Sequence, residues 1–87
     1  MSAEKRSLPD RKWVFVLDMA AGGDLLLRAL APFPVQGAEV TRLDLQTDGG
    51  RARLEIETHG LAPGRAEHLH ARLQALAGVT SVACGWR

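Results

Sequence analysis

Residues 39–59 read EVTRLDLQTDGGRARLEIETH, and this stretch predicts a β-hairpin in the middle of the chain. Polar and apolar residues alternate along both halves, a pattern typical of half-buried strands over Glu39–Thr47 and Arg51–His59. Asp48-Gly49-Gly50 separates the halves, and glycine adopts the positive φ angles of a tight turn without steric cost. The second half is expected to point Ala52, Leu54, Ile56 and Thr58 inward, and Arg51, Arg53, Glu55 and Glu57 outward.

A helix is predicted before the hairpin, over Asp24–Phe33. Apolar residues recur there at the spacing of one helical face, at Leu26, Ala29, Leu30 and Phe33. Asp24 follows two glycines and is expected to cap the helix. Pro32 and Pro34 are expected to end it, because proline lacks the amide hydrogen that a helix interior needs.

A second helix is predicted after the hairpin, over Pro63–Ala77, with Gly78 just beyond its end. Its apolar stripe comprises Ala66, Leu69, Leu73 and Leu76. The outermost segments are strand-like. Trp13–Met19 is apolar on both faces, which is typical of a central strand, and Val79–Trp86 forms the last strand.

The order strand–helix–strand–strand–helix–strand indicates an α+β fold of the ferredoxin-like type. We expect a four-stranded antiparallel sheet with both helices on one face, the first and third strands in the middle, and the second and fourth at the edges. The 87 residues allow one domain. We predict a flexible tail over residues 1–11 and the folded domain over residues 12–87.

Composition excludes several classes of function. A net charge of +1, with acids and bases intermixed, gives no basic face for nucleic acid. No apolar run approaches the roughly 18 residues of a membrane span, and the first residues lack the apolar region of a signal peptide. The single cysteine, Cys84, excludes an internal disulfide and suits a reducing compartment. We therefore expect a cytoplasmic protein that does not bind membranes or nucleic acid.

Catalytic and metal-binding patterns are not apparent. His68 and His70 are two positions apart, so on a helix they point roughly 200° apart and cannot share an ion. Glu55 and Glu57 share a strand face, where a solvated charged surface is the ordinary explanation. Cys84 is expected to pack as a small apolar group. We predict no catalytic residues, no metal site and no cofactor.

Two families with this order of elements are excluded by their site residues. A metallochaperone needs a pair of cysteines after the first strand, where this chain has Ala20-Ala21-Gly22-Gly23. An RNA-recognition domain needs aromatic residues on the third strand, where this chain has Glu55 and Glu57 among apolar and basic residues.

The chain from Trp13 to Cys84 instead resembles the ACT domain, in particular the small regulatory subunit of acetolactate synthase. The family has a P-G-x-L-x-R-V pattern at the first helix and G-F-N-I entering the second strand. This chain has Gly23-Asp24-Leu25-Leu26-Leu27-Arg28-Ala29-Leu30 and Gly37-Ala38-Glu39-Val40. The closing segment Leu76–Val82 also resembles the family's last turn and strand. The resemblance implies ligand-binding residues at Ala21, Gly22, Gly23, Asp24, Leu25 and Glu39.

Two departures from the family pattern bear on ligand binding. Asp24 stands where the family has a glycine that admits the ligand, and Glu39 stands where it has an asparagine that holds it. Both carboxylates are expected to repel the carboxylate of an amino acid. Gly22 and Gly23 also have two interpretations, as an anion site at a helix start or as a tight turn capped by Asp24. Arg28 is expected to be solvated, to pair with Asp24, or to meet a partner.

We therefore expect a non-catalytic regulatory subunit with weak or no amino-acid binding. It is expected to form a homodimer through a sheet edge and to bind a large thiamine-diphosphate-dependent catalytic chain. The predicted interface residues are Arg42, Asp44 and Trp86. The alternative is a free-standing sensor of an amino acid or small anion at the Ala20–Asp24 loop. A small enzyme is a third hypothesis, which no residue pattern supports.

Overall fold

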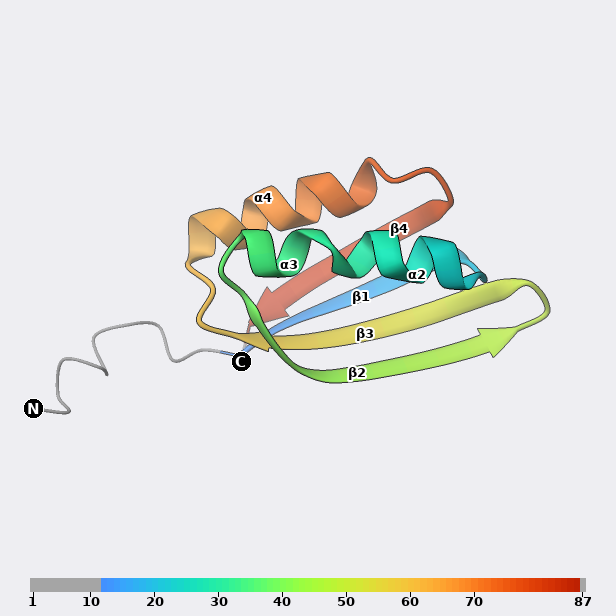
Figure 1. Cartoon of the computed structure of the whole chain (residues 1–87), viewed down its shortest axis with the longest axis horizontal. Helices are drawn as coiled ribbons and strands as arrows, with labels where there is room; N and C mark the ends of the chain where they lie inside the picture. Colours follow the sequence, from blue (N-terminus) through green and yellow to red (C-terminus); the bar gives the residue numbers. More distant parts are fainter. Residues whose placement is uncertain (1–11, 87) are drawn as a thin grey trace, which may run out of the picture.

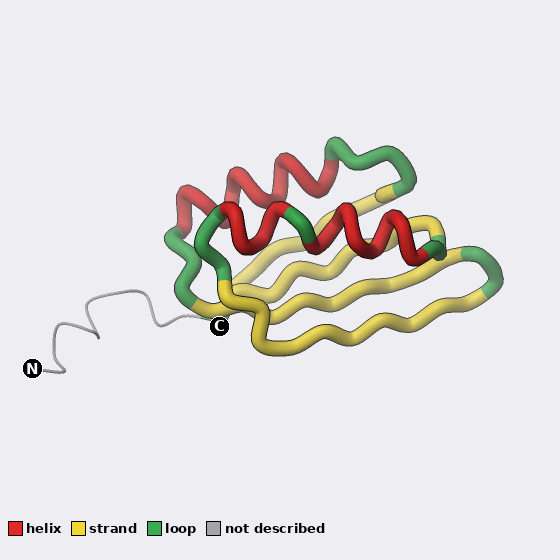
Figure 2. Tube along the Cα trace, in the orientation of Figure 1, coloured by secondary structure: helices red, strands yellow, loops and turns green. Residues whose placement is uncertain are grey.

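The computed structural model describes residues 12–86, which form one sheet with helices on one face (Figures 1 and 2). The elements are β1 (Trp13–Ala20), α2 (Gly23–Leu30), α3 (Pro32–Val35), β2 (Glu39–Asp48), β3 (Arg51–His59), α4 (Pro63–Gln74) and β4 (Val79–Trp86). The strand order is β2-β3-β1-β4, and every neighbouring pair is antiparallel. The predicted ferredoxin-like α+β fold, with β1 and β3 central, is confirmed. The predicted tail, residues 1–11, lies outside the described residues.

The core lies between the sheet and the helices. Strands β1 and β3 contribute the inward set of the predicted alternation, which is buried: Trp13, Phe15, Leu17, Met19, Ala52, Leu54, Ile56 and Thr58. The rings of Phe15 and Phe33 meet edge to face, with centroids 5.2 Å apart and planes at 89°. Such aromatic pairs add stabilisation beyond the area they bury. The α3 segment is therefore anchored to the central strand.

The predicted first helix is in fact two helices. Helix α2 ends at Leu30, and Pro32 begins α3 rather than ending a helix. Proline fits the first position of a helix because the amide hydrogen it lacks has no helical acceptor there. The buried residues of the two helices are Leu25, Ala29, Pro32 and Phe33. Ala29 and Phe33 belong to the predicted stripe, whereas Leu25 is buried in place of Leu26, and Leu26 and Leu30 are only partly buried.

Asp24 does not cap this helix, which corrects the prediction. The N-cap residue is Gly22, and no side chain makes a capping hydrogen bond. Asp24 lies inside the first turn, where its carboxylate accepts a hydrogen bond of 3.0 Å from Arg28 one turn later. Arg28 is thus both solvated and paired with Asp24, which combines two of its three interpretations. Because both side chains are exposed, the pair contributes little stability.

The second helix is shorter than predicted. Helix α4 ends at Gln74, with Ala75 as its C-cap residue, and buries Ala66, Leu69 and Leu73 as expected. Gly78 is therefore not the residue directly after the helix. Its φ is +98°, and a Cβ built on it would lie 2.8 Å from Cδ2 of Leu25. Gly78 forms the turn that leads into β4.

The hairpin follows the sequence pattern closely. Gly49 and Gly50 form the turn with φ angles of +57° and +85°. A register shift lies between Val40 and Arg42 on β2. Charged residues of β3 lie on the helix-free face as predicted, although Glu57 is only 9% exposed. Arg53 pairs there with Asp18 of β1, and Glu57 pairs with Lys12, the residue before β1.

Candidate functional site

The loop between β1 and α2 is fixed by backbone hydrogen bonds on both sides. The amide of Ala20 donates to the carbonyl oxygen of Gly78 at 2.8 Å, and that of Ala21 donates to Gly50 at 2.9 Å. The loop therefore lies between the turn before β4 and the β2–β3 hairpin turn. Figure 1 shows these three connections at the same end of the sheet. Bonds to two separate turns therefore hold the backbone of this loop in place.

The start of α2 is open to solvent. Gly22 and Gly23 are exposed, and a Cβ built on either residue meets no atom within 4 Å. Because no side chain caps the helix, the first-turn amide groups face this open space. Leu25 differs from the other predicted ligand-binding residues, since its side chain is buried in the core. Only its backbone is available to a ligand.

Glu39 lies far from this loop within one chain. It begins β2 opposite His59, whereas the loop follows Ala20, which lies opposite Arg51. These positions are at opposite ends of the sheet. Their separation is roughly 25 Å for eight residues of extended strand. The structure thus brings together Ala21, Gly22, Gly23 and Asp24, and leaves Glu39 apart from them.

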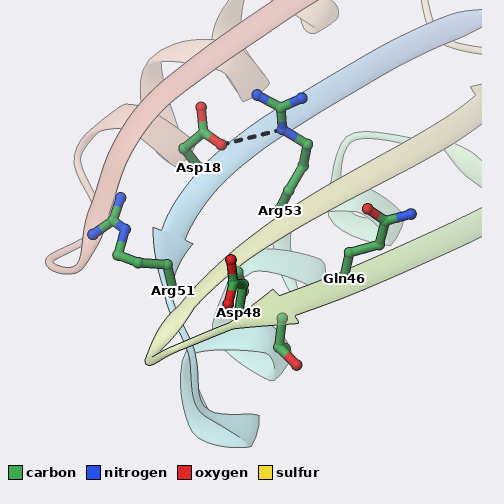
Figure 3. A pocket seen from close by; sticks show the side chains of 7 residues that line it. Asp18, Gln46, Asp48, Arg51 and Arg53 are labelled. Atoms are coloured by element: carbon green, nitrogen blue, oxygen red, sulfur yellow. Dashed lines mark hydrogen bonds and ion pairs between the residues drawn. The ribbon is translucent and has the colours of Figure 1, made fainter.

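A depression of about 330 Å³ lies on the helix-free face, near the same hairpin end (Figure 3). Its lining includes Asp18 of β1, Arg51 and Arg53 of β3, and Gln46 and Asp48 of β2. Arg53 Nε lies 3.3 Å from a carboxylate oxygen of Asp18, and Figure 3 shows these side chains reaching toward each other. The depression therefore contains the Arg53–Asp18 ion pair and a second guanidinium group, which belongs to Arg51.

Asp18 is the electrostatic centre of this depression. The hydrogen bonds from Arg53 and from the Ser81 hydroxyl, the latter 3.0 Å long, lower the pKa of Asp18 below its ordinary value. Arg51 donates to the neutral hydroxyl of Thr80, so its charge is available to an anion. The sequence analysis did not single out these residues. The available signal was one carboxylate in the otherwise apolar run Trp13–Met19.

The predicted interface residues lie on two different edges of the sheet. Arg42 and Asp44 are on β2, while Trp86 is on β4. Trp86 is 52% exposed, and β2 also exposes Leu43 and Leu45, at 47% and 43%. In a two-fold contact the same edge of both copies takes part. One such edge-to-edge contact therefore cannot include the β2 residues and Trp86 together. The β2 edge is the one with exposed aliphatic side chains.

Within residues 12–86, no three His, Cys, Asp or Glu side chains gather where they could hold one metal ion. His70 contacts the Val82 carbonyl oxygen, whereas His68 is exposed. Cys84 packs against the core as predicted, and burial raises the pKa of its thiol. Over the same residues, none of the helices combines the length and apolar character needed to cross a bilayer.

The sequence matches no known family model. Nor does it match any curated protein. Solved structures do share its fold. The ACT domain of GTP pyrophosphokinase from Chlorobium tepidum superposes with a TM-score of 0.74, at 9% identity over 85% of this chain and 96% of that one. The C-terminal domain of the MgtC protein from Mycobacterium tuberculosis gives 0.72, at 14% identity over 88% and 87%.

A formyltetrahydrofolate deformylase from Pseudomonas putida is also similar, with a TM-score of 0.53 and 20% identity over 87% of this chain but 28% of that one. At such identities the likeness establishes the fold and leaves the function open. The chain thus has the fold of an ACT domain. None of these comparisons concerns the small subunit of acetolactate synthase.

Proposed function

We propose that this chain is a non-catalytic regulatory module of the ACT type that works as a homodimer paired through β2. The carrying observation is the open β2 edge. Leu43 and Leu45 lie opposite Ile56 and Leu54 of β3, on the side of the sheet that the helices cover, yet they are nearly half exposed. A sheet that continues into a second copy would cover them, and unpaired edge strands favour such pairing.

The sequence of β2 suits a two-fold pairing centred on Leu43. In that antiparallel register, Arg42 lies opposite Asp44 of the partner subunit, and the two copies of Leu43 face each other. Cross-strand pairs of opposite charge and apolar cross-strand pairs both stabilise antiparallel sheets. The surface is therefore self-complementary, as a two-fold interface requires.

The same register supports a composite ligand site. Glu39 of the partner subunit would lie opposite Thr47, at the hairpin end of the sheet. That end carries the β1–α2 loop, whose Ala21 amide bonds to Gly50. Pairing thus offers a reason why the predicted ligand-binding residues are split between two ends of one chain. Because Asp24 and Glu39 are both acidic, we expect free amino acids to bind weakly or not at all.

The partner in this proposal is a large thiamine-diphosphate-dependent chain of the acetolactate synthase type. Its support is the sequence resemblance at the first helix and at the start of β2. The alternative is a free-standing sensor of an amino acid or small anion. The uncapped start of α2, with its exposed glycines, favours that alternative.

Two measurements test these proposals. Sedimentation equilibrium of the purified chain is expected to give a dimer, and a monomer across the concentration range would overturn the pairing. The chain is then mixed with an acetolactate synthase large subunit, and an increase in its activity supports the regulatory subunit. A rise in melting temperature in millimolar valine, leucine or isoleucine, without any effect on the large subunit, would instead support the sensor.

A further inference from the structure

A second cavity lies at the opposite end of β1 from the β1–α2 loop. It has a volume of about 500 Å³ and is lined by Trp13, Glu67, His70, Cys84, Gly85 and Trp86. These residues come from the start of β1, the first half of α4 and the end of β4, which Figure 1 shows at one end of the fold. Its volume falls in the range of small-molecule sites.

Trp13 lines this cavity, and its indole carries an unsatisfied hydrogen-bond donor. The Trp13 residue is only 8% exposed, and its Nε1 is buried without a hydrogen-bond partner. Buried polar groups in native proteins almost always have a partner, because a donor removed from water and left unbonded is costly. A ligand with an acceptor atom would supply what this side chain lacks.

The other polar groups of the cavity attract donors and positive charge. His70 Nε2 lies 2.9 Å from the Val82 carbonyl oxygen. Because a carbonyl only accepts, Nε2 carries the hydrogen, and in the tautomer with that single hydrogen Nδ1 is an acceptor. Glu67 adds a carboxylate from an exposed position on α4. Both tryptophans line the cavity, and aromatic faces attract cations as well as flat rings.

We propose that this cavity binds a small aromatic amine. The flat ring of the ligand lies against the indole rings, an acceptor oxygen receives the Trp13 N–H, and the ammonium group lies beside Glu67. The indole turns its N–H edge toward the cavity on binding, since that atom is shielded in the empty site. The site is separate from the β1–α2 loop by the length of β1, roughly 20 Å.

The chain is well suited to test this site by fluorescence. It contains two tryptophans and no tyrosine, and both tryptophans line the cavity. The probe is tyramine, which combines a phenol oxygen with an ammonium group. A saturable change in tryptophan emission is expected. Two analogues separate the contacts: phenethylamine lacks the acceptor oxygen, and 4-hydroxyphenylacetate replaces the ammonium group with a carboxylate.

The expected order of affinity is tyramine first, then phenethylamine, then 4-hydroxyphenylacetate. Loss of the single hydrogen bond should weaken binding about tenfold, and the reversed charge should weaken it further. Equal affinity for tyramine and 4-hydroxyphenylacetate would overturn the proposal. So would the absence of any saturable emission change with tyramine.

Variants assign the contacts to residues. Glu67→Gln is expected to weaken tyramine binding about tenfold, whereas His68→Gln, a change of an exposed neighbour on α4, should leave it unchanged. Trp13→Phe should reduce tyramine affinity to that of phenethylamine and leave phenethylamine unaffected, with Trp86 as the remaining reporter. If Glu67→Gln and His68→Gln behave alike, or if Trp13→Phe weakens both amines equally, the assignment is wrong.

Discussion

The two edge strands of this sheet, β4 and β2, differ in how far the helices cover their residues. On β4, helix α4 packs across the strand, Val82 is buried, and its carbonyl oxygen contacts the ring of His70. On β2, no residue is fully buried, and Leu43 and Leu45 remain nearly half exposed. The fold thus has one edge strand that α4 covers at Val82, although five of its eight residues are exposed, and one edge strand without a buried residue. An exposed edge with aliphatic side chains is a surface for strand pairing.

The β2 edge is the more favourable of the two for pairing with a second copy. Among the described residues, α4 packs mainly against β4, and the short helix α3 contacts β2. Leu43 and Leu45 of β2 nevertheless stay nearly half exposed. The uncovered strip along β2 is the part of the inner face that a second copy could complete.

The largest expected effect comes from placing a charge on the open edge. Leu43→Asp should weaken self-association by about 100-fold or more, since each interface loses two buried leucines and gains two buried charges. Sedimentation equilibrium measures the dissociation constant. Leu27→Asp is the matched control, because Leu27 is 68% exposed on α2 and away from this edge. If both variants dimerise like the wild type, β2 is not the interface.

The next largest effect is a loss of stability in the turn that leads into β4. Gly78→Ala should lower the free energy of unfolding by about 1–3 kcal/mol, because a side chain at positive φ is strained. The added Cβ also lies 2.8 Å from Cδ2 of the buried Leu25, which must shift. Urea denaturation measures the loss. Gly64→Ala, at an open helical position, should instead raise stability by up to about 1 kcal/mol.

A smaller loss of stability is expected at the contact between α4 and β4. His70→Ala removes the donor that contacts the Val82 carbonyl oxygen and should cost about 1 kcal/mol. His68→Ala, two residues earlier and exposed, should change stability by less than about 0.5 kcal/mol. Equal effects of the two substitutions in thermal unfolding would mean that the contact at Val82 does not help to hold α4 against β4.

Much of this architecture could be predicted from the sequence, because period-two alternation and the glycine pair define the hairpin without tertiary information. The phase of the first helix could not. Leu25, Leu26 and Leu27 are consecutive leucines, so local spacing allows more than one apolar face. Packing of Leu25 near Gly78 decides the face, and that contact joins segments more than fifty residues apart. Likewise, a proline pattern alone does not distinguish a helix end from the start of a new one.

The candidate site was predicted less completely than the fold. The β1–α2 loop was predicted from the family resemblance and from the two glycines that follow an apolar strand. The separation of Glu39 from that loop follows from the antiparallel order itself, which puts the start of β2 at the other end of the sheet. The aromatic cavity depends on how α4 crosses β4. Nothing in the local sequence places Trp13 and Trp86 together, since they join only through the β1–β4 register.

The smallest effect is expected on the helix-free face of the sheet, where side-chain hydrogen bonds join β4 to the other strands. Asp18 accepts hydrogen bonds from Arg53 of β3 and Ser81 of β4, so it links β4 to the rest of the sheet. Because these bonds lower the pKa of Asp18 in the folded state, their stabilisation is present above the unfolded pKa of 3.8 and is lost as the pH falls through the lowered folded value.

The wild-type melting temperature should therefore fall more than that of Asp18→Asn between neutral pH and pH values below the folded pKa of Asp18. The two curves should converge at the acid end. The difference is small, because this side chain is partly exposed and solvent screens its charge. Asp24→Asn is the control, since its carboxylate pairs within one helix. Parallel melting curves for wild type and Asp18→Asn would mean that the outer-face link does not help to hold β4.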